Sequence, residues 1–524
     1  MTRRIILTAV ATLHVAVLLI AVSPPCYAVV DTLFGLLDGP DAEQSASIVD
    51  AQRWSTLLGN TAVVCGVAML TALGLGGFYG ILAARTDLPG RSLLVGGAVL
   101  GACVPVYVSL VFVISFIPVG ALTESAIACG LLYGLIYAPL ATVVLGVAFR
   151  MVDRDLEEQA LLDAGPGTVL LRVTLPQAGW GVATLGILVL LLVGTDYTIT
   201  DILMVRTFAE EVYTQYALAR TRAGPLITAA PVFVALAVLL VWLQVRYRLL
   251  GEGTPWQLGA RPRVIALGRW RAGVALICVL LPTILLGVPA YSLLRRIGSV
   301  DAFFGTARAV WGELSISASL AAAGGVIIVT AAVGLAWGAI RGGRWRGPIY
   351  AATVLLLASP APVIGISLIG ILNRPGWPGA ICDSPAVIVI GYLVRFLPIG
   401  VLLLLPAVQR VPIELELAAR IDGCDWLSAQ RHVYWPAMAR SIAVAWLVVV
   451  ILCFTELGAT MLVVPPGWAT ASVRAFTLIH YGVYRDLAVL AVLSLASVVL
   501  PWAVLVWFLK RWLARSTSIP SRSV

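Results

Sequence analysis

The chain has 524 residues, of which 60% are hydrophobic and only 12% are charged, and its formal net charge at pH 7 is +9. Soluble domains are nearer 45–50% apolar and about 25% charged. This composition excludes a soluble protein of such length, because too few polar groups are present to cover its surface. It indicates a protein of the lipid bilayer.

Uncharged or nearly uncharged runs predict the membrane helices, since ~20 apolar residues span a hydrocarbon core. The first run also resembles a secretory signal, with Arg3 and Arg4 before it and Cys26-Tyr27-Ala28 near its end. It is long for a signal core, and we expect it to be retained as a helix. The twelve predicted runs are 5–30, 54–84, 92–123, 125–149, 177–195, 223–245, 272–294, 314–340, 347–373, 384–409, 441–473 and 487–509.

The basic residues predict the orientation, because Lys and Arg favour cytoplasmic loops. With the N-terminus inside, most of the 35 basic residues fall in cytoplasmic segments, and acidic residues gather outside, as in residues 31–50. Both termini are then cytoplasmic. Topology explains the positive net charge, and no basic cluster interleaved with aromatic residues indicates nucleic-acid binding.

The two halves of the sequence are similar at an offset of 260 residues. This offset aligns Val173-Thr174-Leu175-Pro176 with Val433-Tyr434-Trp435-Pro436, and it aligns residues 195–200 with residues 455–460 without a gap. An even number of helices separates equivalent points, so both halves face the same way. We therefore expect an all-α integral membrane fold of about twelve transmembrane helices in two parallel six-helix repeats. The expected divisions are a first repeat at 1–248, a cytoplasmic linker at 249–271, a second repeat at 272–510 and a cytoplasmic tail at 511–524.

One cytoplasmic segment in each half, at about 150–177 and about 410–438, differs from the other loops. Each begins as a short helix with early acidic residues, which suit the helix dipole, and a following Gly suits a C-terminal cap. An interfacial connecting helix has the same character, but two copies at equivalent positions favour a docking role. The residues predicted to share one face are Leu156, Ala160 and Leu161 in the first segment and Leu417, Ala418 and Ile421 in the second.

These segments resemble the EAA loop of the membrane subunits of bacterial ABC importers, whose pattern is E-A-A, three residues, Gly and a later Leu-Pro. Two departures are clear: Gly165 falls two positions later than Gly423, and Leu417 stands where the alignment expects a Glu, with Glu416 beside it. The resemblance implies the type I ABC importer permease fold, in which each loop docks as a coupling helix on a cytoplasmic ATPase. It assigns ATPase coupling to Glu157, Glu158, Ala160, Asp163, Gly165, Pro176, Glu416, Ala418, Ala419, Asp422, Gly423 and Pro436.

The sequence itself carries no motif for ATP hydrolysis. A P-loop needs a Lys after its glycines, whereas the single Lys, Lys510, follows Val506-Trp507-Phe508-Leu509. We expect no catalytic residue and no cofactor in this chain, with ATP and Mg²⁺ held by a separate partner. The cysteines are scattered, and we expect no metal site.

Ionisable residues inside predicted helices are functional candidates. Asp196 and Glu456 occupy equivalent places in the fifth helix of each half, ~24 Å from the helix start and so in the outer third of a ~30 Å core. If the halves meet about a pseudo-axis, the two carboxylates lie near the outer mouth of a central pathway and suit a cation, with Thr195 and Thr455 adding oxygens. The alternative is that each acid caps or pairs locally and holds an outer loop.

Arg395 is predicted near mid-membrane, and its counterpart in the first half is Ile136. It can attract an anion, pair with Glu456 as a gate, or extend towards the membrane surface. Depth separates Arg395 from Glu456 by ~10 Å along a straight helix, so direct pairing requires a helix break or tilt.

Three further motifs are similar to those of fused, double-length permeases of ferric-iron importers, with thiamine permeases as relatives. They are Thr195-Asp196-Tyr197-Thr198, Arg395-Phe396-Leu397-Pro398 and Thr455-Glu456-Leu457-Gly458-Ala459-Thr460. The resemblance implies a permease of the bacterial inner membrane, a periplasmic substrate-binding protein, a cytoplasmic ABC ATPase homodimer and ATP-driven alternating access.

Ferric iron is the expected substrate, with thiamine, a polyamine or an anion as alternatives. The competing class is an ion-coupled secondary transporter, which also has a six-plus-six helix repeat. Such a transporter binds no ATPase, so it would not need two cytoplasmic loops for docking.

Overall fold

The computed structural model describes residues 2–37, 51–116, 120, 122–217, 224–247, 265–282, 288–424 and 426–516. Regular structure in these ranges is helical, apart from an isolated bridge between Thr86 and Ile265. The first half contains α1 (Thr2–Leu37), α3 (Ala51–Arg85), α4 (Arg91–Ala102), α5 (Val106–Phe116), α6 (Ala126–Arg150), α7 (Arg154–Asp163), α8 (Pro166–Val169), a π-helical turn (Leu170–Thr174), α9 (Leu175–Gln177), α10 (Gly179–Gly194), α11 (Thr198–Ile202), α12 (Phe208–Ala217) and α13 (Gly224–Tyr247).

The second half continues the helical fold to the end of the described chain. Short 3₁₀ turns at Gly268–Trp270 and Gly343–Trp345 precede two of its helices. Its elements are α14 (Arg271–Pro282), α15 (Val288–Ile297), α16 (Val300–Ala309), α17 (Trp311–Arg341), α18 (Arg346–Ala358), α19 (Ala361–Leu372), α20 (Trp377–Cys382), α21 (Ala386–Gln409), α22 (Ile413–Ile421), α23 (Trp426–Ala429), a π-helical turn (Gln430–Tyr434), α24 (Trp435–Thr455), α25 (Thr460–Val463), α26 (Ala471–His480) and α27 (Tyr484–Ser516).

Seven helices in the described part of the chain are long and apolar enough to cross a membrane, or up to nine if each of two bent pairs is one span. One pair, at 166–177 and 179–194, bends by 59°, and the other, at 343–358 and 361–372, bends by 105°. The seven are Thr12–Phe34, Gln52–Arg85, Ala126–Arg150, Trp311–Arg341, Ala386–Gln409, Gln430–Thr455 and Tyr484–Val504. An all-helical membrane protein is thereby confirmed.

Three of the twelve predicted runs fall outside these spans and coincide with shorter helices. The run at 92–123 divides into α4 and α5, the run at 223–245 lies within α13, and the run at 272–294 includes α14 and part of α15. The count of twelve helices therefore stays a prediction. Most of the predicted linker, up to residue 264, and residues 517–524 of the predicted tail lie outside the described residues.

Glycines allow the central helices to pack closely. A Cβ added to Gly76 of α3 would lie 2.2 Å from the Cβ of Ala141 in α6, and one added to Gly134 would lie 2.4 Å from Thr71 Cβ. Side chains of ordinary size would force α3 and α6 apart at both points. Small residues at helix interfaces are the usual means of close packing in membranes.

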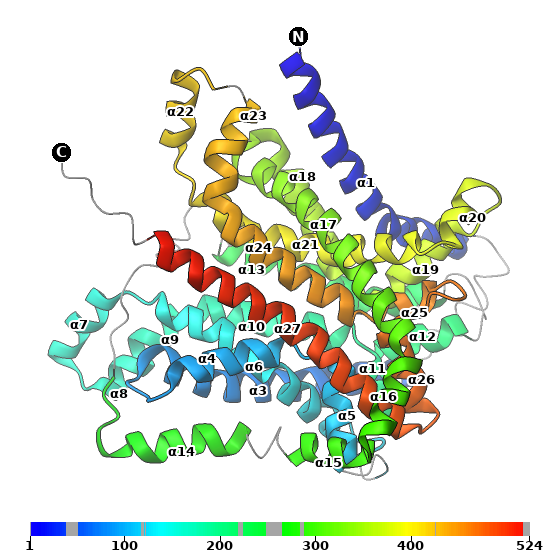
Figure 1. Cartoon of the computed structure of the whole chain (residues 1–524), viewed down its shortest axis with the longest axis horizontal. Coiled ribbons are helices and arrows are strands. Elements are labelled where there is room, and N and C mark those ends of the chain that lie inside the picture. Colours follow the sequence, from blue (N-terminus) through cyan, green and yellow to red (C-terminus); the bar gives the residue numbers. More distant parts are fainter. Residues whose placement is uncertain are drawn as a thin grey trace.

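The two halves exchange their leading helices. α1 packs on α18, α19 and α21 of the second half, while α15 of the second half packs on α5 of the first. Gly334 in α17 has no room for a side chain, because an added Cβ would lie 1.8 Å from His14 Nε2 of α1. Figure 1 shows α1 beside α18 and α19, so the halves are interlocked rather than merely adjacent.

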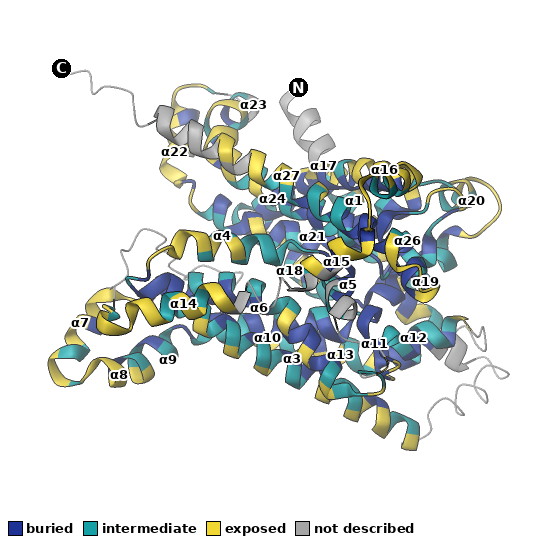
Figure 2. Cartoon of the chain, turned by 60° about the horizontal axis from the view of Figure 1, so that its bottom comes forward, coloured by how far each residue is buried: buried dark blue, intermediate teal, exposed yellow. Residues whose placement is uncertain are grey.

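The short helices divide between two ends of the molecule. α7 and α8 lie at the same end as α22 and α23, on the left in Figure 1, whereas α12, α20 and α26 lie at the opposite end. Figure 2 preserves this separation after a rotation of 60°. Both segments predicted to bind an ATPase therefore lie at one end.

Equivalent points of the halves carry equivalent local structure. The π-helical turns begin at Leu170 and Gln430, which are 260 residues apart. In the first half, Arg53, the third residue of α3, pairs with Glu211, the fourth residue of α12. In the second half, Glu313 and Arg474 occupy the same places in α17 and α26, and their charged groups lie 3.7 Å apart. The same contact is thus made with reversed charges.

Candidate functional site

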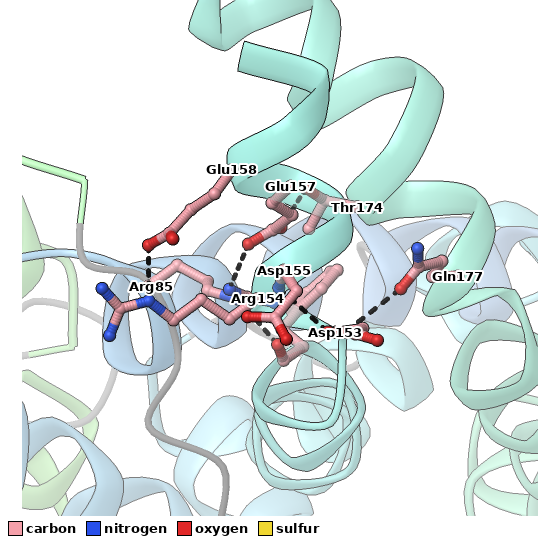
Figure 3. A network of polar contacts seen from close by, with 9 residues as sticks. Arg85, Asp153, Arg154, Asp155, Glu157, Glu158, Thr174 and Gln177 are labelled. Atoms are coloured by element: carbon pink, nitrogen blue, oxygen red, sulfur yellow. Dashed lines mark hydrogen bonds and ion pairs between the residues drawn. The ribbon is translucent and has the colours of Figure 1, made fainter. Parts of the chain in front are cut away.

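The first predicted coupling segment is anchored inside the protein by Glu157. Its side chain is only 4% exposed, and its Oε2 lies 2.8 Å from Nη1 of Arg85. The hydroxyl of Thr174 donates to Glu157 Oε1 at 2.5 Å, and Arg85 Nε donates to the Phe149 carbonyl at 2.7 Å. Figure 3 shows this network around the start of α7. It joins α3, α6, α7 and the π-helical turn.

The other predicted residues of this segment face outward to different extents. Glu158 is exposed and pairs with Arg154 at 2.5 Å, and Ala160 is partly buried. Asp163 ends α7 and is exposed, as is Pro176 in the short helix α9. Glu158 and Asp163 are therefore accessible to a partner, while Glu157 is not.

The expected C-terminal cap at Gly165 is wrong. Its φ of −67° and ψ of 158° are extended, and it precedes the first residue of α8, Pro166. A residue before proline favours this conformation, so the chain turns here without a left-handed glycine. The Gly at this position begins the next helix and does not end α7.

The second segment does have the expected glycine cap. Gly423 has a φ of +76°, and the Cys424 N–H donates to the Ala419 carbonyl at 2.9 Å. This is the Schellman geometry that favours glycine after a helix. Asp422 and Ala418 are exposed and Ala419 is buried.

The remaining predicted residues of the second segment are Glu416 and Pro436. Glu416 lies in α22, but its side chain is outside the described part of the structure. Pro436 is exposed in the first turn of α24.

Both predicted coupling segments expose apolar side chains. The most exposed are Leu162, at 86%, and Ile421, at 85%. Leu156, Leu415 and Leu417 are each about half exposed.

The two acids of the predicted pathway both cap short helices. Asp196 Oδ1 accepts the Thr198 N–H at 2.7 Å, at the start of α11. Glu456 accepts the Ala459 N–H at 2.8 Å and the Thr460 N–H at 3.0 Å, and it also accepts the Thr460 hydroxyl. Local capping, one of the two alternatives from the sequence, is present in both halves.

Arg395 connects the halves near these acids. Its Nη1 donates to the Ser359 carbonyl, at the 105° bend between α18 and α19, and its Nη2 donates to Thr195 Oγ1, both at 3.2 Å. Among the described residues, no ion pair joins Arg395 to Glu456.

The predicted threonines are held differently. Thr195 meets Arg395 across the halves and also donates to the Leu191 carbonyl at 2.6 Å. Thr455 donates to the Leu452 carbonyl at 3.1 Å. The structure therefore brings Thr195 and Arg395 together as the sequence grouped them, while the described bond of Thr455 is local.

A second contact between the halves joins α11 to α26. Asp201 Oδ2 in α11 lies 2.9 Å from His480 Nε2 in α26. Burial raises the pKa of the Asp201 carboxyl, and His480 lowers it in turn. The Tyr197 ring stacks on Tyr213 and meets Phe476 edge to face, so aromatic packing reinforces this contact.

The sequence did not mark four residues of these contacts: Arg85, Thr174, Asp201 and His480. Arg85 had a signal, since it follows a long uncharged run directly. Asp201 and His480 stand in no motif. Within the described residues, no group of three or more His, Cys, Asp or Glu is placed to hold a metal ion.

Residues 328–519 match the family model described as binding-protein-dependent transport system inner membrane component. This part of the chain is a permease domain, which is a non-catalytic transport component. The match supports a permease of a binding-protein-dependent ABC transport system for this part of a chain with several candidate membrane spans, and such systems use ATPase and binding-protein partners in general. Over 455 residues it is 22% identical to the Fe(3+)-transport system permease protein FbpB 2 of Haemophilus influenzae, an alignment that covers 83% of this chain and 86% of that protein.

Proposed function

We propose that the chain forms the complete translocation pathway of an ABC importer, with two parallel six-helix halves in place of two permease subunits. The offset of 260 residues, the paired π-helical turns and the charge-reversed ion pairs support two copies of one unit. The exchanged leading helices support a single body in which the halves act together.

The coupling helices α7 and α22 dock on a cytoplasmic ABC ATPase homodimer, which holds ATP and Mg²⁺. Their common end of the molecule and their exposed leucine and isoleucine side chains support this role. Both chain termini are cytoplasmic in this orientation. The family match, together with two exposed coupling helices at one end, is the observation that carries the proposal.

The substrate is ferric iron, delivered to the opposite end by a periplasmic binding protein. The printed name of the relative, Fe(3+)-transport system permease, supports this choice, as do the motifs around Asp196, Arg395 and Glu456. Closure of the ATPase opens the pathway outward, and ATP hydrolysis returns it inward. Thr195 and Thr455 line the pathway beside the two acids.

Co-purification with an ATPase, followed by an uptake assay, tests the class of transporter. The tagged chain is co-expressed with a candidate ABC ATPase, and the purified complex is reconstituted in proteoliposomes. Uptake of radioactive ferric iron is then measured in the presence of the substrate-binding protein. Uptake is expected to require ATP on the side of the membrane where the ATPase is bound. Uptake driven by a proton or sodium gradient without an ATPase would instead establish the secondary transporter.

The double variant Asp196→Asn, Glu456→Gln tests the pathway. Loss of the two charges is expected to abolish uptake of a cation while leaving the complex with the ATPase assembled. Glu313→Gln is the matched control, because it removes an acid at the start of α17. Unchanged uptake kinetics in the double variant would leave the acids as helix caps alone.

A further inference from the structure

The carboxylate of Glu157 is committed to partners within its own chain. One oxygen meets Arg85 at 2.8 Å and the other accepts the Thr174 hydroxyl at 2.5 Å. With 4% of the residue exposed, neither oxygen is available to an ATPase at the surface. The acidic residue assigned to partner contact by the sequence is therefore an internal residue.

Arg85 makes the network rigid because it is fixed from several directions. It is 1% exposed and is the last residue of α3. Beyond its bond to Glu157, its Nε donates to the Phe149 carbonyl near the end of α6. Charge-assisted hydrogen bonds are stronger than neutral ones, and burial makes separation of such a pair costly. α7 cannot tilt independently of α3 and α6 without breaking these bonds.

The same corner also holds the beginning of the second half. The Ile265 N–H donates to the Arg85 carbonyl at 2.6 Å, and the Asp87 N–H donates to the Ile265 carbonyl at 3.3 Å. Asp87 Oδ1 then accepts the Leu267 N–H at 2.9 Å. Movement of α7 is thereby linked through the end of α3 to the chain that enters the second half.

An arginine also ends the long helix at the corresponding corner of the second half. Arg341 ends α17 and donates its Nη2 to the Val411 carbonyl at 2.7 Å, and its guanidinium lies 5.8 Å from the Trp337 ring. Tyr434, at the place of Thr174, meets Trp337 edge to face at 4.4 Å. Glu416 is the fourth residue of α22, as Glu157 is of α7, and its side chain lies outside the described part of the structure.

We propose that Arg85 and Glu157 are positioning residues that join the first coupling helix rigidly to α3 and α6. α7 then moves as one body with these two helices. The consequence for transport rests on the proposed function. The joint itself, which is the attachment of α7 to α3 and α6 through Arg85 and Glu157, does not depend on that function.

Hydrogen exchange of the purified chain in lipid nanodiscs tests the joint without any partner. Glu157→Gln is expected to accelerate exchange of the amides of α7 by at least ~10-fold, because the buried Arg85 loses its counter-charge. Glu158→Gln is the matched control on the same helix, since its exposed pair with Arg154 contributes little. Thr174→Val should give a smaller acceleration, which Thr174→Ser should reverse by restoring the hydroxyl.

Equal exchange of α7 in the wild-type and Glu157→Gln chains would overturn the joint.

The ratio of iron transported to ATP hydrolysed tests the consequence. In complexes purified to equal ATPase content, Glu157→Gln and Arg85→Gln should lower this ratio several-fold, which a residue needed only for assembly would not do. An unchanged ratio despite faster exchange would overturn the positioning role. Failure of the wild-type chain to bind any ATPase would refute the proposed function while leaving the exchange result for the joint standing.

Discussion

The two predicted coupling corners place similar helices at equivalent points, and the contacts described for their arginines differ. In the first half, Arg85 pairs with the buried Glu157. In the second half, Arg341 lies beside Trp337, which in turn packs on Tyr434. Both arginines end a long helix; Arg85 donates to a carbonyl near the end of α6, and Arg341 donates to one just after α21. The comparison teaches that the helix arrangement is shared while the described contacts of the two arginines are not.

The ends of the halves opposite the predicted coupling helices show a second difference of this kind. Arg53 with Glu211 and Glu313 with Arg474 join the same two helices in each half, with opposite polarity. An ion pair has the same Coulomb energy when its charges are exchanged. The position of the contact is therefore retained although its sign is not.

The largest expected difference in local stability comes from exchanging the residues at positions 157 and 417. Glu157→Leu leaves Arg85 buried without its counter-charge and should destabilise α7 by about 3–5 kcal/mol. Leu417→Glu places a charge on an exposed site of α22 and should change local stability by no more than about 0.5 kcal/mol. Local opening free energies from hydrogen exchange measure both, and equal effects in the two halves would remove the asymmetry.

Substitutions in the Arg53–Glu211 and Glu313–Arg474 pairs should also destabilise the first half more than the second, but by a smaller difference. Glu211→Gln disturbs a buried carboxylate that also accepts the Gln215 amide at 2.6 Å, and we expect a cost of about 1–3 kcal/mol. Arg474→Gln removes a partly exposed partner, for which we expect less than about 1 kcal/mol. Exchange in α12 and α26 reports each effect. A larger loss from Arg474→Gln would reverse this ranking.

Trp337→Leu tests whether the aromatic contacts stabilise the second corner. The edge-to-face contact with Tyr434 contributes about 0.5–1.5 kcal/mol, and the cation–π contact with Arg341 about 0.5–1 kcal/mol. Exchange of the π-helical turn at 430–434 should accelerate accordingly, with Trp337→Phe retaining part of the protection. No change in either variant would mean that the carbonyl bond of Arg341 alone holds this corner.

The two glycines should respond in opposite directions to the same small substitution. Gly423→Ala forces a side chain into a left-handed conformation and should cost about 1–2 kcal/mol. Gly165→Ala meets open space and an allowed φ, and should be neutral or stabilise by about 0.4–1 kcal/mol. Thermal unfolding of the purified variants measures both effects, and a destabilised Gly165→Ala protein would contradict the extended geometry.

The sequence determined the features that depend on composition and order along the chain. Hydropathy predicted the membrane location and most spans, because burial in lipid requires long apolar runs. The internal offset located both coupling segments, and the pattern after residue 421 predicted the glycine cap at Gly423. Each of these signals is carried by neighbouring residues or by a fixed spacing.

Only the tertiary structure decided which residues meet. It buried Glu157 against Arg85, paired Thr195 with Arg395 across the halves, and joined Asp201 to His480. These partners are separated by 72 to 279 positions, so no local pattern specifies them. Their contacts follow from how the helices pack. Packing also places Glu157, which the sequence assigned to partner contact, inside the protein.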